Sequence, residues 1–362
     1  MGLSKSLLLV LASGLAILSG GGLIASAQTS SSWSTPVNLG ATVNTASTEG
    51  CPFLSKDGLS LYLASNRAGT LGGLDIYVSH RTSADGQWGT PVTIGPTINS
   101  TASDRCPLIT PDEKSLIFVS DRAGGAGNTD LYIATRTDTR DDFGWGTPTN
   151  IFTINASSDE YGPSAFADAA GTLTLFFTSN RPGGLGGFNI YSSVRGANGV
   201  FGDTTLVTEL SSSADDTFPL VRKDGLAMFL ASNRPGTLGG FDLWSATRSS
   251  TTARWSAPVN MGPVVNGTAN EQRPTISSDG ATIIFMSDRP GGFGGVDLYT
   301  TTLNAVRAPA PPNTGTGLAQ DAGRSRAAFL VMSFAGAAAA GLGCFGLGVF
   351  AKTQRAARRR AG

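Results

Sequence analysis

The sequence repeats a unit of about 55 residues five times, and this repeat limits the folds that the chain can adopt. A tryptophan opens four of the copies, and a phenylalanine opens the fourth copy in chain order. One such unit cannot bury both of its faces alone, whereas five units packed around an axis can. The openings, which lie 55, 57, 56 and 54 residues apart, are Trp33, Trp88, Trp145, Phe201 and Trp255.

Each unit contains short strand-like runs separated by turn residues. An apolar run such as SLYLASNR is followed by a Gly-rich loop and then by a second run such as DIYVSHR. Runs of β-branched and aromatic residues between Gly, Pro and Asp are typical of strands. Asp-Gly pairs, as at Asp57-Gly58, favour tight hairpins. We therefore expect an all-β chain with about four short strands in each unit.

The two ends of the repeat array predict how the ring closes. A strand led by an aromatic residue precedes each of the five three-stranded modules, but none follows the last module, which ends near Val306. The strand at Trp33–Leu39 is therefore free to complete the last blade. The sequence predicts a five-bladed β-propeller over residues 28–306, closed by its N-terminal strand. Its repeats are expected at about 33–87, 88–144, 145–200, 201–254 and 255–306.

The repeated motif resembles that of a known family. CPFLSKDGLSLYLASNRAGTLGGLDIYVSHR and its copies are similar to the TolB-like, or WD40-like, β-propeller repeat, whose pattern is P-x-x-S-x-D-G-x-x-L-Y-F-x-S-N-R. The resemblance covers roughly residues 33–306 and recurs five times. It implies the propeller fold and a role as a partner-binding platform or accessory domain. Because one fold hosts many functions, it specifies no ligand.

Both ends of the chain are typical of targeting segments. Residues 1–27 combine Lys5, an apolar stretch and Ala25-Ser26-Ala27, as in a cleaved signal peptide. Residues 327–351 contain no charge and are long enough to form a transmembrane helix, and a basic tail follows at 352–362. By the positive-inside tendency, we expect an exported protein, anchored at the cell surface by one C-terminal helix with its N-terminus outside.

The linker at 307–326 contains a stretch that resembles the sortase sorting signal LPxTG. Pro312, Thr314 and Gly315 match that pattern, and Pro311 stands where the family has leucine. The resemblance implies that a sortase cleaves between Thr314 and Gly315 and joins the threonine to the cell wall. The departure at Pro311 leaves two alternatives, attachment to the wall and anchoring by the helix itself.

One carboxylate recurs three residues before the proline of each unit. We expect this segment to lead into the innermost strand, so that five acidic groups ring one mouth of the central channel. The candidates for binding a ligand or cation there are Glu49, Asp104, Glu160, Asp216 and Glu271.

One arginine also ends the apolar strand of each unit. The structural interpretation is a repeated ion pair with the recurring carboxylate, within or between blades. These arginines are Arg67, Arg122, Arg181, Arg234 and Arg289.

A second acidic position begins the last strand, directly after the Gly-rich loop. A carboxylate there can accept hydrogen bonds from loop amides. The alternative is a calcium loop, because carboxylates and carbonyls suit a hard cation. We predict no cofactor, with calcium left open. The residues are Asp75, Asp130, Asp242 and Asp297, with Asn189 in the third copy.

Cys51 and Cys106 occupy the same register in the first two units, each directly before the proline. Outside the cell a disulfide between them is chemically allowed. Two buried free thiols are the other interpretation.

The charge balance disfavours one class of partner. Residues 28–315 contain 18 Lys and Arg against 25 Asp and Glu, whereas a protein that binds nucleic acid needs a basic face. We therefore expect no nucleic acid partner, and a protein, a glycan or an envelope component as the ligand.

Few residues support catalysis. His80 is the only histidine of the chain, and no G-x-S-x-G motif occurs. The carboxylates recur with the repeat, whereas a catalytic acid and base need different environments. We predict a non-catalytic binding platform and not an enzyme. The alternative is a carbohydrate-active enzyme, like the five-bladed glycoside hydrolases, that uses carboxylates at the channel mouth.

Overall fold

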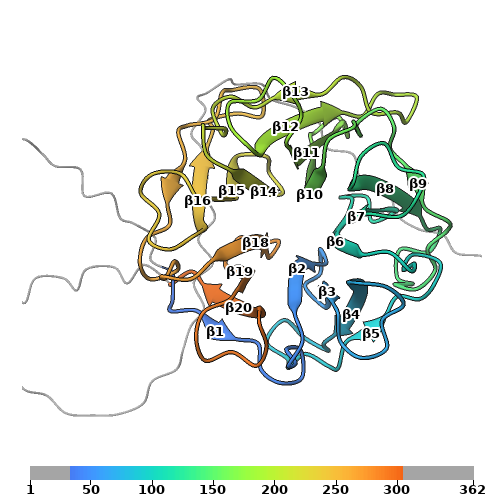
Figure 1. Ribbon diagram of the computed structural model, residues 1–362, viewed down its shortest axis with the longest axis vertical. Coiled ribbons are helices and arrows are strands. Elements are labelled where there is room, and N and C mark those ends of the chain that lie inside the picture. The colour runs from blue at the N-terminus through green and yellow to red at the C-terminus, as the bar shows by residue number, and fades with distance from the viewer. Residues whose placement is uncertain (1–32, 305–362) are drawn as a thin grey trace, which may run out of the picture. The chain divides into compact units, whose positions relative to one another are not determined.

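The computed structural model describes residues 33–304, which form five four-stranded antiparallel sheets around a central channel (Figure 1). Each sheet is one blade, and the chain passes from blade to blade around the ring. The predicted five-bladed propeller is therefore confirmed. The predicted signal peptide, sorting signal, transmembrane helix and basic tail lie outside the described residues.

Four blades use four consecutive strands, numbered from the channel outward. Blade 1 contains β2 (Glu49–Leu54), β3 (Ser60–Ser65), β4 (Asp75–His80) and β5 (Val92–Thr93). Blade 2 contains β6 (Asp104–Ile109), β7 (Ser115–Ser120), β8 (Asp130–Thr135) and β9 (Thr149–Asn150). Blade 3 contains β10 (Glu160–Ala167), β11 (Leu173–Ser179), β12 (Asn189–Val194) and β13 (Thr205–Leu206). Blade 4 contains β14 (Asp216–Val221), β15 (Ala227–Ser232), β16 (Asp242–Thr247) and β17 (Val259–Asn260).

Blade 5 joins the two ends of the described chain. Its strands are β18 (Glu271–Ile276), β19 (Thr282–Ser287), β20 (Asp297–Thr302) and, from the N-terminal side, β1 (Val37–Asn38). Val37 pairs with Thr300, and Asn38 Nδ2 donates to Asp297 Oδ2 at 2.8 Å. The predicted closure by the first strand is confirmed, although the paired strand is shorter than Trp33–Leu39.

The core lies between neighbouring blades. Tyr62 and Ile76 of blade 1 pack with Leu116 and Phe118 of blade 2, and all four are fully buried. The faces that neighbouring sheets turn toward each other thus bury the apolar surface that one blade cannot bury alone. Within residues 33–304 there is no helix with the length and apolar character needed to cross a membrane.

Each innermost strand is kinked at the residue before its proline. The pairing of the two inner strands shifts there, and the residue adopts a positive φ of 50–54°. Proline has no N–H for the sheet ladder, so a bulge at this position accommodates it. The five kinks form a neck in the channel, at Cys51, Cys106, Gly162, Phe218 and Arg273.

Asn44 joins the two ends of the ring, so its substitution should lower the stability of the fold. The buried Asn44 amide donates to Leu298 O at 3.0 Å and accepts from Leu298 N at 2.9 Å. Asn44→Ala leaves the Leu298 N–H without its acceptor, while Leu298 O keeps the hydrogen bond from the Leu39 amide at 3.0 Å. The change should lower the free energy of unfolding by about 1–3 kcal/mol. Urea denaturation measures this change.

The matched control is Asn44→Ser. Blade 3 has a serine in the equivalent place, where Ser211 Oγ accepts from Ile190 N at 3.1 Å. The serine variant should therefore lose less stability than the alanine variant. Equal stability of wild type and Asn44→Ala would contradict the role given to this side chain.

Candidate functional site

The five recurring carboxylates are fully buried inside the blades. In blade 1, Glu49 Oε1 accepts from Ser65 Oγ at 2.8 Å and from Arg67 Nη2 at 3.3 Å. Its other oxygen accepts from the Thr45 amide at 2.7 Å. The other blades repeat the arrangement, with Arg–carboxylate distances of 2.5 Å for Arg122–Asp104 and 3.0 Å for both Arg181–Glu160 and Arg289–Glu271, and a close pair Arg234–Asp216.

The expectation that these carboxylates ring the channel mouth therefore needs correction. Each begins the innermost strand, but its side chain turns back into its own blade, where the serine and the arginine satisfy it. Burial raises the pKa of Glu160, and hydrogen bonds from Ala156, Ser179 and Arg181 act against that rise. Such fully partnered groups fix the geometry of a blade and are closed to a ligand.

The acids after the Gly-rich loops are also buried. Asp75 accepts from the Leu71 amide at 2.8 Å, and Asp242 accepts from the Leu238 amide at 2.8 Å. Asp130 and Asp297 bind loop amides in the same way, and Asn189 accepts from Leu185 N at 2.8 Å in blade 3. Within residues 33–304, no three His, Cys, Asp or Glu side chains gather in a group that could hold a metal ion.

The proposed disulfide is absent. Cys51 and Cys106 are both free and buried at the neck of the channel. Burial raises the pKa of the Cys51 thiol, while the positive charges of Arg273 and Arg105 act in the opposite direction.

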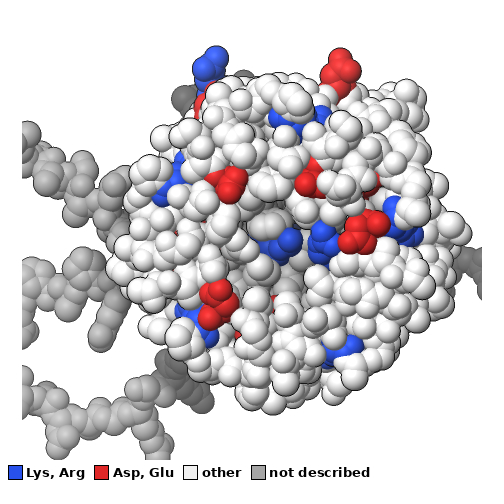
Figure 2. All heavy atoms as spheres, in the orientation of Figure 1, with Lys and Arg blue, Asp and Glu red and all other residues white. Residues whose placement is uncertain are grey.

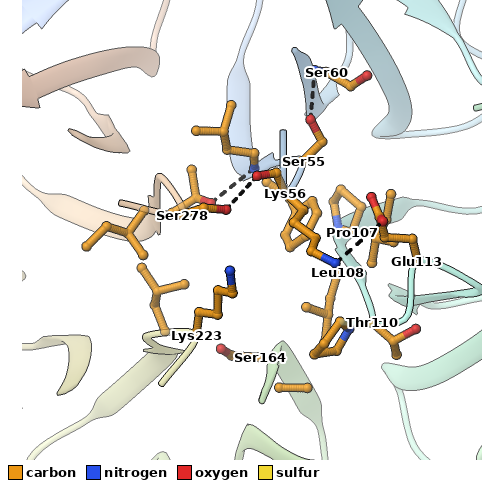
Figure 3. A pocket seen from close by; sticks show the side chains of 18 of the residues that line it. Ser55, Lys56, Ser60, Pro107, Leu108, Thr110, Glu113, Ser164, Lys223 and Ser278 are labelled. Carbon is orange, nitrogen blue, oxygen red and sulfur yellow. Dashed lines mark hydrogen bonds and ion pairs between the residues drawn. The ribbon is translucent and has the colours of Figure 1, made fainter. Parts of the chain in front are cut away.

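A cavity opens where the innermost strands turn back into their neighbours. It has a volume of about 730 Å³. Its floor is made by one proline from each blade, and its wall by apolar residues such as Phe53 and Leu220 and hydroxyls such as Ser55 and Ser164 (Figure 3). The five prolines are Pro52, Pro107, Pro163, Pro219 and Pro274.

Glu113 breaks the fivefold pattern at the mouth of this cavity. It has a φ of 62°, a conformation that glycine adopts at the equivalent turn position in each of the other blades, at Gly58, Gly171, Gly225 and Gly280. A left-handed conformation is strained for a residue with a side chain and is found most often where function requires it. Glu113 lines the cavity and lies 3.9 Å from Lys56 (Figure 3).

Asp142 is the second carboxylate of this side of the cavity. It belongs to the loop between β8 and β9 of blade 2, and Arg136 Nη1 donates to its Oδ1 at 2.8 Å. Arg136 Nε also donates to the Glu113 carbonyl oxygen at 2.9 Å, so one guanidinium joins the two acidic residues. The sequence analysis missed Glu113, although comparing the five turns would have found it. It also missed Asp142, which has no repeated counterpart.

Hydrogen bonds hold Asp142 in its ionised form. Burial by itself would raise its pKa, but the nearby Tyr62 hydroxyl and donors from Arg136, His80 and Ser60 bring the pKa below its usual value. His80 Nε2 lies 2.9 Å from Asp142 Oδ2, and Ser60 Oγ donates to the same oxygen at 2.8 Å. Ser60 and His80 thus share the carboxylate, and this is not the chain of contacts that activates a serine nucleophile.

No family model and no curated protein matches the sequence. Solved structures nevertheless share the fold. An α-L-arabinofuranosidase from Lactobacillus brevis is 14% identical with a TM-score of 0.51, over 74% of this chain and 94% of that one. An endo-arabinase from Bacteroides thetaiotaomicron is 13% identical with a TM-score of 0.50, over 73% and 97%. A TolB-type protein from Agrobacterium tumefaciens is 16% identical with a TM-score of 0.43, over 75% and 92%.

These structures correct one expectation from the sequence. The chain was expected not to be an enzyme, in part because its carboxylates recur with the repeat. That expectation is wrong, because glycoside hydrolases are prominent among the solved structures that have this propeller fold. At identities of 13–14% the likeness shows the fold alone, so a function has to be argued from this chain's own residues.

The environment of Asp142 predicts a pH-dependent contribution to stability. Its folded pKa lies below the unfolded value of 3.8, so the stabilisation is present above pH 3.8 and is lost as pH falls through the folded pKa. Asp142→Asn should lower the free energy of unfolding at pH 7 by about 2 kcal/mol. The difference from wild type should shrink below pH 3.8.

Urea denaturation between pH 7 and pH 2.5 measures this difference, with the exposed Asp203→Asn as the matched control. The control should stay within about 0.5 kcal/mol of wild type throughout. A difference for Asp142→Asn that is independent of pH would contradict the ionised state assigned to this residue.

Proposed function

We propose that the protein is a carbohydrate-active enzyme of the glycoside hydrolase type, which binds a glycan in the channel cavity and cleaves a glycosidic bond there. The observation that supports this most strongly is Glu113, a carboxylate at a strained turn position that glycine occupies in the other four blades. The other four blades close this turn with glycine, so the hairpin itself does not require an acid here. Its side chain lines the cavity, and this supports a role in chemistry.

The cavity has the size and surface that a sugar chain requires. Its volume of about 730 Å³ falls in the range of ligand sites. Prolines and residues such as Leu108 and Ile276 offer apolar surface to the C–H faces of sugar rings. Hydroxyls such as Thr110 and Ser277 offer hydrogen bonds to sugar hydroxyls.

The two carboxylates are suited to different roles. Glycoside hydrolysis uses one group that transfers a proton to the leaving oxygen and a second, ionised carboxylate that faces the positive charge on the sugar ring. Asp142 is held ionised by its hydrogen-bond donors and, unlike the repeat carboxylates, keeps an exposed fraction of 12% where it lines the cavity, so it takes the second role. Glu113 takes the first role, because the only partner of its carboxylate among the described residues is the Lys56 ammonium group at 3.9 Å.

The location of the enzyme stays a proposal from the sequence. We propose export directed by residues 1–27, and retention at the cell surface either by the segment 327–351 or by a sortase acting at Thr314 and Gly315. A glycan of the cell envelope or of the surroundings would then be within reach of the cavity.

Substitution of Glu113 should separate function from stability. Glu113→Gly introduces the residue that the other four blades have, so it should raise the free energy of unfolding by about 1 kcal/mol. The same change removes the proton-transferring group, so hydrolysis should fall by about 100-fold or more. Reducing-sugar release from a panel of arabinan, xylan and acidic polysaccharides measures the activity.

Two further variants sharpen the test. Glu113→Gln keeps the strain and the size but cannot transfer a proton, so it should lose activity without the gain in stability. Glu209→Gln changes a carboxylate outside the cavity and should change neither. A wild-type protein that releases no sugar from any substrate of the panel, or a Glu113→Gln variant with full activity, would contradict the proposed function.

A further inference from the structure

The channel is more basic than the blades around it, because its cavity is lined by Lys56, Arg136, Arg140 and Lys223 against Asp57, Glu113 and Asp142. Residues 33–304 contain 17 Lys and Arg against 25 Asp and Glu, a net charge of −8. In contrast, basic side chains gather beside the central opening in Figure 2, over β6 and β18, while acidic groups lie farther out. The electrostatic potential of such a domain becomes more positive toward the channel, and this favours the binding of an anion there.

Lys223 is the first of these channel cations. It belongs to the turn between β14 and β15, and its side chain points into the cavity from the wall opposite Lys56 and Glu113 (Figure 3). Among the described residues, no carboxylate lies within ion-pair distance of its ammonium group, whereas Lys56 has Glu113 at 3.9 Å. The charge of Lys223 is thus available to a ligand in the cavity.

Arg273 is the second channel cation, and it lies at the neck. Its Nη1 donates to Cys51 Sγ at 2.5 Å, and its guanidinium lies 3.7 Å from the centre of the Phe218 ring. No carboxylate in residues 33–304 pairs with it, whereas Arg105 has Asp121 at 3.7 Å. Burial, aided by the charge of Arg105, lowers the pKa of Arg273 to about 10, so it is still charged at neutral pH.

A charged guanidinium without a carboxylate partner is costly in the interior of a protein. The five arginines that end the apolar strands each have such a partner. Arg81, Arg195 and Arg248 have none among the described residues, and each stacks on the aromatic ring that opens the next repeat. Arg273 differs from these three because it lies at the neck of the channel. The neck and the cavity are lined by the same five prolines, which makes them parts of one continuous channel. A ligand in the cavity can therefore carry the missing negative charge.

We propose that the channel selects an acidic glycan, whose carboxylate or sulfate groups are bound by Lys223 and Arg273. This inference rests on the proposed function, since it names the chemical class of the glycan in the same cavity. The acidic outer surface repels long polyanions such as nucleic acids, which need an extended basic face. A sugar chain that enters the channel meets the basic groups instead.

Matched ligands test the charge preference directly. Isothermal titration calorimetry on the full chain would compare oligogalacturonate with its fully methyl-esterified form, and dextran sulfate with dextran. Wild type should bind at least one charged form about tenfold or more tightly than its neutral counterpart, and the difference should shrink as salt is raised. The two pairs distinguish carboxylate from sulfate as the bound group.

Substitutions test whether the basic residues of the channel cause that preference for the charged form. Lys223→Met and Arg273→Met should each weaken binding of the charged form by about tenfold and leave binding of the neutral form unchanged. Arg254→Met removes a charge at an exposed site outside the channel and should have no effect. Arg273→Lys keeps the charge, and thermal unfolding of each variant identifies any loss of folding. If Arg273→Met fails to fold, Lys223→Met alone still tests the assignment.

The outcomes separate the two proposals. Equal binding of charged and neutral forms would overturn the acidic preference and leave the glycan site in place. Wild-type affinity for the charged form in the folded Lys223→Met and Arg273→Met variants would place binding elsewhere and also overturn the inference. No binding of either form, together with no hydrolysis of any neutral or acidic substrate, would overturn the proposed function itself.

Discussion

The fold depends on a buried carboxylate, serine and arginine that recur in every blade. In blade 1, Glu49 binds Ser65 and Arg67, and Arg67 donates onward to the carbonyl oxygen of Val43 at 2.8 Å. One unit thus ties the innermost strand, its neighbour and the incoming connection. The guanidinium also lies 5.1 Å from the centre of the Tyr77 ring on the next strand. Burying this charge is tolerable because nearly every donor and acceptor of the unit has a partner, and the loss of one partner would leave an uncompensated ion.

The five blades share the same residues at one end of the propeller and differ from one another at the other end. At the end with the Gly-rich loops, each blade repeats the same buried hydrogen bonds, so the residues there serve the fold. At the other end, the turns after the innermost strands need only close a hairpin. Most of them do so with a glycine at positive φ, and blade 2 does so with Glu113. Residues that depart from the repeat, such as Glu113 and Asp142, are therefore the ones that can carry chemistry.

The repeat predicted the blades and the ring closure, because strand number and order follow directly from the spacing of the units. It could not reveal where the carboxylates point, since the first residue of a strand can face the channel or its own blade. Glu49 faces inward to its blade because Ser65 and Arg67 lie on the adjacent strand and loop, a pairing that only the register discloses. Glu113 was visible as a departure from Asp57-Gly58 and its copies. Asp142 was not, because its partners Ser60 and His80 belong to blade 1 and only the fold brings them to it.

The neck of the channel shows how identical backbones can present different chemistry. All five neck residues share the same left-handed conformation, which glycine adopts most easily, yet only Gly162 is a glycine. It has to be, because a Cβ there would lie 2.6 Å from the Phe218 ring. Phe218 in turn supports Arg273, and Arg273 contacts Cys51. Each non-glycine residue costs about 1 kcal/mol in this conformation. Cys51 and Cys106 offset that cost by packing in one apolar cluster of the core, and Phe218 packs against another. Arg273 adds a charge and no apolar surface to the core, so among the neck residues it is the one best explained by a ligand in the channel.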